Sequence, residues 1–211
     1  MQLDYRLTLL EIQKLAYFLQ EAGEPLRLRY EPGIYGPYAP NLNKVLEVLE
    51  GHLIRGYGDT QKPDVEIELL PGAVEEADRF LGNRPDVRGR LDRVGSLIAG
   101  FETPYGMELL ASVHWIACHD PIPAANAESA VQRIGEWSNR KARMFKPDHI
   151  RVAWNRLASQ DWIPPSNELP PAERVVSGSL PEGGITRRKA PEGPSESSSG
   201  RAKRARGYDG N

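Results

Sequence analysis

The aromatic residues of this 211-residue chain almost stop at Trp162, and this boundary limits which part of it can fold. All four Trp, all four Phe and seven of the eight Tyr precede residue 164, and only Tyr208 follows. From Pro164 to Asn211, Pro, Gly, Ser, Glu, Arg and Lys dominate. Such a segment buries too little apolar surface to offset the entropy lost on ordering. The sequence therefore predicts one folded domain, residues 1–163, and a disordered tail, residues 164–211.

Charge divides at the same boundary. Residues 1–163 carry 23 acidic and 19 basic side chains, a net charge of −4, whereas the tail carries 6 and 8, a net charge of +2. An acidic folded part disfavours nucleic-acid binding. The single Cys118 excludes an intrachain disulfide, no apolar run is long enough to span a membrane, and the N-terminus lacks the features of a signal peptide. We therefore expect a cytoplasmic protein without membrane contact.

Hydrophobic spacing predicts a mainly helical domain. Residues 8–22 have an amphipathic pattern, and Thr8 with Glu11 forms a capping-box signature at the start. Alternation of leucines with arginines predicts a short strand over residues 26–30. A second helix is expected over residues 42–54, with Asn41 as its cap. Further helices are expected from about residues 72–73, over residues 85–100, 104–118 and 126–144, and from Pro147 onward.

A β-ribbon is expected between the second and third helices, formed by Leu53-Ile54 and residues 65–69. Helix, turn, helix, ribbon and helix follow one another in the order of a winged-helix unit. The predicted fold class is therefore mainly α with a small β-ribbon (α+β), a winged-helix-like N-terminal half being followed by a helical bundle.

Short catalytic and cofactor motifs are missing from the sequence. It contains no GxxxxGK[ST], no GxGxxG after a strand and no GxSxG. His114, Cys118 and His119 are residue types that bind zinc, but their apolar neighbours indicate a core helix, in which a lone cysteine is usually a small buried group. We therefore predict that the chain is not an enzyme and holds no cofactor or metal.

Two features favour binding. The Gly- and Pro-rich loop over residues 32–40 presents Tyr35 and Tyr38, either as a recognition surface or as a cover over the core. The predicted ribbon and the helix after it carry seven acids between Asp59 and Asp78 against one base, Lys62. These carboxylates either form a solvated surface or imitate a phosphate backbone and occupy a nucleic-acid site on a partner protein.

Two longer stretches carry a family resemblance. Residues 7–59, LTLLEIQKLAYFLQEAGEPLRLRYEPGIYGPYAPNLNKVLEVLEGHLIRGYGD, resemble the C-terminal region of DarG antitoxins. They are more distantly similar to Panacea/SocA-type antitoxin domains, which share a QKLxYF…YGP pattern. Residues 137–157, WSNRKARMFKPDHIRVAWNRL, resemble the end of the same DarG module. Together the resemblance covers roughly residues 5–163.

The resemblance implies a protein partner. DarG antitoxins counter DarT, a toxin that uses NAD to ADP-ribosylate thymidine in single-stranded DNA. Their macrodomain removes the modification, and their C-terminal domain binds the toxin and blocks its DNA site. Because these 211 residues show no resemblance to a macrodomain, the resemblance implies an antitoxin-like module that occludes a DarT-type toxin without glycohydrolase activity. It leaves open whether the chain is a fragment of a macrodomain protein, a split gene product or a stand-alone module, and whether a separate macrodomain protein is a second partner. The expected contact residues are Tyr35, Tyr38, Asn41, Glu66 and Glu68.

The alternative function is a winged-helix DNA-binding transcriptional regulator. Since the ribbon is acidic, nucleic acid is not expected on that face. The basic surface of such a regulator would instead combine Arg140, Lys141, Arg143 and Lys146 with the tail segments Arg187–Lys189 and Arg201–Arg206.

Overall fold

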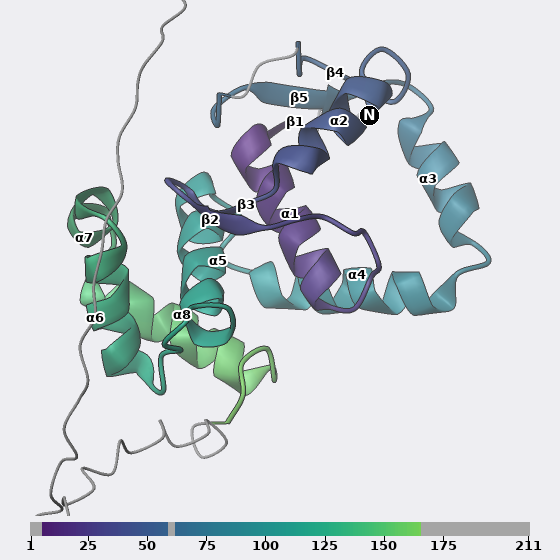
Figure 1. The fold of residues 1–211 in the computed structure, drawn as a ribbon. Coiled ribbons are helices and arrows are strands. Elements are labelled where there is room, and N and C mark those ends of the chain that lie inside the picture. Colours follow the sequence, from purple (N-terminus) through teal and green to yellow (C-terminus); the bar gives the residue numbers. More distant parts are fainter. Residues whose placement is uncertain (1–5, 59–61, 166–211) are drawn as a thin grey trace, which may run out of the picture. The chain divides into compact units, whose positions relative to one another are not determined.

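The computed structural model describes residues 6–58 and 62–165 (Figure 1). Within these ranges helices dominate and the strands are short, which confirms the predicted mainly helical α+β class. Except for residues 164 and 165, the predicted tail lies outside the described residues. The elements in chain order are β1 (Arg6–Thr8), α1 (Leu9–Glu21), β2 (Glu31–Gly33), β3 (Gly36–Tyr38), α2 (Pro40–Leu49), β4 (Ile54–Arg55), β5 (Glu66–Leu69), α3 (Ala73–Leu81), α4 (Pro85–Ile98), α5 (Pro104–Cys118), α6 (Ala127–Trp137), α7 (Asn139–Met144) and α8 (Pro147–Ser159).

Helix α1 joins the two hydrophobic clusters of the fold. Its start is the predicted capping box, because the Thr8 side chain accepts from the Glu11 amide and the Glu11 carboxylate accepts from the Thr8 amide. Leu9, near this end, packs with α2, β4 and β5. Tyr17 and Phe18, two turns later, are fully buried among α4, α5 and α8. In Figure 1, α1 accordingly runs from the small sheet towards the helical end.

Helix α5 is the centre of the helical end. Its residues are buried on nearly every side, as expected for a helix that is apolar all round. It packs against α1, α6 and α8, and α8 also covers α6. Among the described residues, no helix is long and apolar enough to cross a bilayer.

The predicted β-ribbon is present, but it belongs to a three-stranded antiparallel sheet. Strand β5 is central and pairs with β4 on one side, where Ile54 faces Leu69. On its other side it pairs with β1, where Leu7 faces Ile67. Strand β1 was not predicted, because three residues next to a helix cap show too little alternation to indicate a strand.

The strand predicted over residues 26–30 is wrong. Two side-chain amides bind its backbone in place of a neighbouring strand: Gln20 pairs with both the amide and the carbonyl of Leu28, and Asn41 binds the Arg29 amide and the Arg27 carbonyl. The predicted cap of α2 is also wrong. Asn41 lies inside this helix, which begins at Pro40 after Ala39. The strands lie further on, where β2 and β3 form a hairpin.

Two predicted helices also differ in extent. The helix expected over 42–54 ends at Leu49, and the chain then turns into β4. The helix expected over 126–144 is interrupted at Ser138, whose extended backbone ends α6 and whose hydroxyl accepts from the Lys141 amide to start α7. This interruption turns Arg140 and Lys141 towards the interior.

Two glycines provide a matched test of the sheet. Both have positive φ, but a Cβ at Gly56 would lie 2.4 Å from the Glu66 carbonyl oxygen, whereas a Cβ at Gly51 meets nothing within 4 Å. Gly51→Ala is expected to lower the free energy of unfolding by about 1–2 kcal/mol through backbone strain. Gly56→Ala is expected to lower it by about 1–3 kcal/mol more, because β5 must shift. Equal losses in urea unfolding would contradict the close approach of Gly56 to β5.

Candidate functional site

A buried carboxylate on α5 binds two consecutive basic side chains of α7. Glu108, with 3% of its side chain exposed, accepts two hydrogen bonds from Arg140, at 2.6 and 3.0 Å. Lys141, fully buried, donates to the same carboxylate at 2.8 Å and to the Ser112 hydroxyl at 3.0 Å. The bidentate arginine and the adjacent ammonium give Glu108 more than one compensating charge.

Lys14 of α1 adds a third cation to this network. Its side chain is 1% exposed, and its ammonium donates to the Pro37 carbonyl at 2.6 Å. Burial, reinforced by the charge of Lys141 and opposed by that of Glu108, lowers the pKa of Lys14 to about 7. Burial also lowers the pKa of Lys141, although Glu108 opposes this shift. The cluster of Glu108, Arg140, Lys141 and Lys14, called here the Glu108 network, therefore has an excess of positive charge.

The β2–β3 hairpin lies directly on the Glu108 network. Gly36, at φ +85°, approaches so closely that a Cβ there would lie 2.8 Å from the Ser112 hydroxyl. At the turn, the Tyr35 ring lies under the Arg140 guanidinium, 4.4 Å from its centre. This cation–π contact holds Arg140 between an aromatic face and a carboxylate.

A cleft opens next to this network, and we call it the Arg140 cleft. Its volume is about 430 Å³, and Arg140, Tyr35, Tyr105 and Glu108 contribute polar or aromatic groups to its wall. A smaller cavity of about 60 Å³, lined in part by Lys14, Tyr35 and Tyr38, adjoins it. Both spaces share Leu10, Tyr35 and Pro63 as lining residues.

The residues predicted to bind a partner fall in three places. Tyr35 and Tyr38 meet at the small cavity; Tyr35 is 37% exposed, and the half-buried Tyr38 hydroxyl accepts from Asn43. Asn41 binds the Arg29 amide and the Arg27 carbonyl. Glu66 and Glu68 lie on β5, apart from the tyrosines. The binding role of these five residues stays a prediction.

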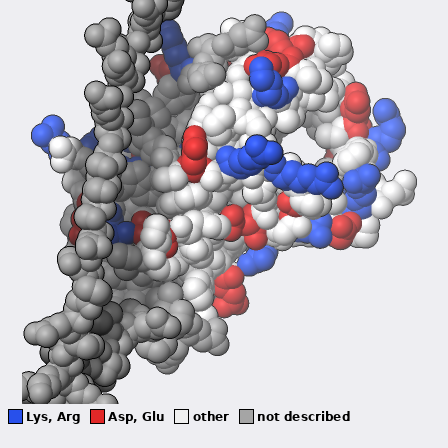
Figure 2. Space-filling view, in the orientation of Figure 1, with Lys and Arg blue, Asp and Glu red and all other residues white. Residues whose placement is uncertain are grey.

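The acids of the ribbon lie closer to basic side chains in the structure than their order in the sequence suggests. Arg6 of β1 lies 3.5 Å from Glu66 and 3.9 Å from Glu68, and Arg55 of β4 pairs with Glu68. Arg88 of α4 lies 3.8 Å from Asp78. On the face in Figure 2, a row of basic side chains crosses the middle of the described surface, and acidic side chains lie around it. These arginines were missed as partners because they are distant in the sequence or on other elements.

The arginine and lysine expected on a basic outer surface lie elsewhere. Lys141 is fully buried, and Arg140 is bound to Glu108. Arg143 and Lys146 are exposed, whereas the arginines of the tail segments lie outside the described residues. The sequence offered no sign of this inward orientation, because the partner Glu108 is 32 residues away from Arg140.

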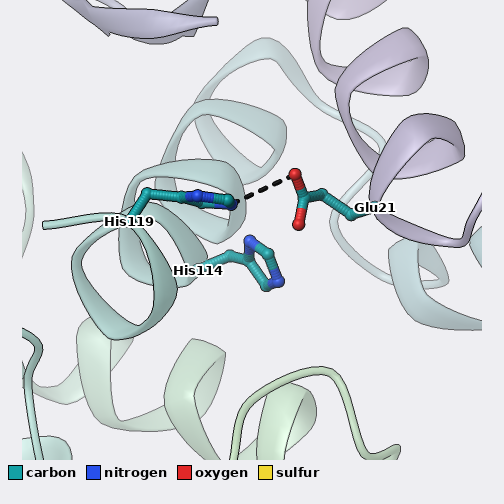
Figure 3. Close-up of side chains that lie close together, drawn as sticks. All are labelled: Glu21, His114 and His119. Atoms are coloured by element: carbon teal, nitrogen blue, oxygen red, sulfur yellow. Dashed lines mark ion pairs between the residues drawn. The ribbon is translucent and has the colours of Figure 1, made fainter. Parts of the chain in front are cut away.

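A second polar cluster lies where α1 and α5 end. Glu21 and His119 form an ion pair at 3.1 Å, and His114 lies beside them (Figure 3). Burial opposes ionisation of Glu21, but the hydrogen bond from His119 and the charges of both imidazoles outweigh it and lower the pKa of this carboxyl. His119 also lines a cleft of about 520 Å³, whose wall includes Trp115, Trp137 and Arg133.

His114 has a partner on each ring nitrogen. Its Nε2 lies 3.0 Å from the Trp162 carbonyl, which only accepts, so this nitrogen carries the proton. Its Nδ1 therefore accepts from the Tyr17 hydroxyl at 2.6 Å. Burial, aided by His119 and opposed by Glu21, lowers the pKa of His114 to about 4. Burial and the charge of Glu21 raise the pKa of the nearby Cys118 to about 11, which keeps it a thiol.

Comparison with known proteins relates the chain to an enzyme. It is 44% identical over 156 residues to a DNA ADP-ribosyl glycohydrolase of Thermus aquaticus, which covers 74% of this chain and 42% of that protein. It is 36% identical over 154 residues to proteins of the same name from Mycobacterium bovis and Mycobacterium tuberculosis, covering 70% of this chain and 43% of each. The chain thus spans about two fifths of the length of these relatives. No family model matches it.

These relatives overturn the functional predictions made from the sequence. They are named as an enzyme that acts on DNA, so the predictions of a non-enzymatic DarG-type toxin-binding domain, of an antitoxin role and of a DarT-type toxin as partner are wrong. A separate macrodomain protein as partner and the winged-helix transcriptional regulator find no support either. The absence of short catalytic motifs was a poor guide to function, because such motifs reveal only sites that are built on one short segment.

His114 gives the fold a specific acid sensitivity. Its pKa is about 4 in the folded protein, against about 6.5 when exposed, so the unfolded chain takes up the proton first as the pH falls. The stability present above pH 6.5 should therefore fall by about 3 kcal/mol between pH 6.5 and pH 4. Urea unfolding across this range should show a shallower loss in His114→Gln than in the wild type. Parallel losses in both proteins would contradict the assignment.

Proposed function

We propose that this chain works as part of a DNA ADP-ribosyl glycohydrolase and holds phosphate groups of ADP-ribosylated DNA in the Arg140 cleft. The observation that carries the proposal is the Glu108 network. Arg140 and Lys141 both bind a single buried carboxylate next to a cleft of about 430 Å³, and the buried amine of Lys14 adds a further basic group. The names of the relatives supply the reaction class, and the network supplies a reason for the chain to attract an anionic substrate.

Phosphate suits the chemistry of this cleft. The planar guanidinium of Arg140 is a strong phosphate donor and lines the cleft with 36% of its side chain exposed. A dianion there would also favour the charged form of Lys14, whose burial otherwise disfavours it. Asp64 and Glu108 are the carboxylates on the wall, and Glu108 is already compensated by its two partners.

Aromatic rings on the cleft wall suit the remainder of the substrate. Tyr35 lies at the hairpin turn, and Tyr105 lies at the start of α5, where its hydroxyl is 2.7 Å from His149 Nδ1. Nucleobases and the adenine of ADP-ribose stack on such rings. The role proposed for these residues is to bind and orient the substrate, so that the bond between the ribose and the DNA is held for attack by water.

The proposal includes three predictions about the chain that nothing yet tests. The helices α1 and α2, the ribbon of β4 and β5, and α3 form the winged-helix-like half, and α5 to α8 form the helical bundle. The protein acts in the cytoplasm, where its DNA substrate lies. Residues 1–163 form the binding domain.

Binding of ADP-ribosylated DNA tests the proposal. Fluorescence anisotropy should show tighter binding of an ADP-ribosylated oligonucleotide than of the same oligonucleotide without the modification. Arg140→Gln should weaken binding about tenfold or more, or about 1.4 kcal/mol, because it removes a charged phosphate donor. The exposed Arg143 on the same helix provides the control, and Arg143→Gln should change binding little. Equal binding of both oligonucleotides would contradict the proposed substrate.

Lys14→Met separates binding from stability. Removing a desolvated amine should leave the free energy of unfolding equal or higher at pH 7, since Met fills a similar volume. The same substitution should weaken binding of the modified oligonucleotide, because it removes positive charge from the network. Unchanged binding in a well-folded Lys14→Met protein, together with unchanged binding in Arg140→Gln, would exclude the Arg140 cleft as the phosphate site.

Turnover is best measured in a chimaera. Replacing the matching segment of the Thermus aquaticus relative by this chain should give a protein that releases ADP-ribose from DNA. Arg140→Gln in the chimaera should raise KM with little change in kcat, as expected for a residue that binds substrate and transition state equally. An unchanged KM would show that the cleft takes no part in substrate binding.

A further inference from the structure

The cluster of Glu21, His114 and His119 contains the donor atoms of a metal site. One oxygen of Glu21 and one nitrogen of each histidine all lie within 4.8 Å of one another. Among the described residues, this is the only group of three such side chains with this spacing. The three come from two helices: Glu21 ends α1, His114 lies within α5, and His119 follows its last residue (Figure 3).

Two of the donors already have the separation that a bound ion requires. Zinc binds histidine nitrogen and carboxylate oxygen at about 2.0–2.2 Å, so two ligands of a tetrahedral ion lie about 3.4 Å apart. The Glu21 oxygen and His119 Nε2 are 3.1 Å apart. These two donors therefore need to move apart by only a few tenths of an ångström to hold an ion between them.

His114 is oriented for coordination through Nδ1. The Trp162 carbonyl accepts the proton of Nε2, which fixes the tautomer and directs the Nδ1 lone pair to the opposite edge of the ring. A histidine ligand commonly donates its second nitrogen to a carbonyl in this way. The Tyr17 hydroxyl donates a hydrogen bond to this lone pair, at 2.6 Å. Metal binding must displace that hydrogen bond.

We propose that Glu21, His114 and His119 bind one divalent transition-metal ion of the zinc type. Two imidazoles with one carboxylate are a ligand set that zinc accepts, whereas magnesium and calcium prefer oxygen alone. The fourth position is left for water, which has access because His119 lines the cleft of about 520 Å³. The Cys118 sulfur is not a ligand, since it lies 3.7 Å from Nε2 of His114, the nitrogen that faces Trp162.

This site is separate from the proposed phosphate site. It uses none of the residues of the Glu108 network, and the proposed function does not require it. Arg140→Gln should therefore leave metal binding unchanged, and loss of the metal site should leave the Arg140 cleft intact. Either proposal can thus fail without the other.

Metal titration of the full chain tests the site. Zn²⁺ added during isothermal titration calorimetry should bind one ion per chain. Co²⁺, used as a spectroscopic probe, should give the intense visible absorption of a four-coordinate ion, and Zn²⁺ should abolish it. Thermal unfolding should shift to higher temperature with Zn²⁺, since the ion binds only the folded state. Failure to bind one ion per chain would overturn the proposal.

Substitutions locate the ion. Glu21→Gln and His119→Gln each remove one ligand at the more exposed side of the cluster and should weaken Zn²⁺ binding tenfold or more. His52→Gln and His149→Gln change the two exposed histidines elsewhere and should not affect it. Full binding in the double variant Glu21→Gln, His119→Gln would mean that zinc is held by other residues and would overturn the proposal.

Tyr17→Phe tests the role of His114 without removing that buried ring. Because the variant frees Nδ1 from its hydrogen bond, Zn²⁺ should bind at least as tightly as in the wild type. Weaker binding would show that the Tyr17 hydroxyl contributes to the site and that Nδ1 of His114 is not the ligand. Circular dichroism should confirm that each variant is folded before its binding is compared.

Discussion

The pairing of Glu108 is the interaction on which the helical half of the structure depends. A carboxylate in the middle of an apolar helix is costly unless charges and hydrogen bonds compensate it. Arg140 and Lys141 are consecutive residues, so both reach Glu108 only if a helix starts immediately before them. The interruption at Ser138 meets this condition, and the hairpin, with Gly36 at its turn, then closes over the network.

Local patterns predicted much of the fold. The Thr8–Glu11 capping box and the pairing of β4 with β5 depend on residues near in sequence or on strong alternation, and the structure contains both. The strand over residues 26–30 failed for a physical reason. Its backbone is satisfied by the side chains of Gln20 and Asn41, and no propensity scale accounts for such partners.

The candidate site was less predictable than the fold. Tyr35 and Tyr38 could be singled out, because a Gly- and Pro-rich loop with aromatic residues is a recognisable recognition surface. The charges were misjudged in both directions. Arg140 and Lys141 seemed to be free surface residues but are both bound to Glu108, and the acids of β5 seemed to repel DNA but have arginine neighbours. Charge counted along a chain says little about the field that a ligand meets once the partners are in place.

The position of α1 also determines when the domain is able to fold during synthesis. This helix is translated before the other helices of the domain, yet Tyr17 is buried against His114, 97 residues later, and His114 in turn binds the backbone of Trp162. The first helix therefore stays without its core until nearly the whole domain has been translated. Contacts between residues so far apart in the sequence slow folding, and apolar surface stays exposed until these contacts form.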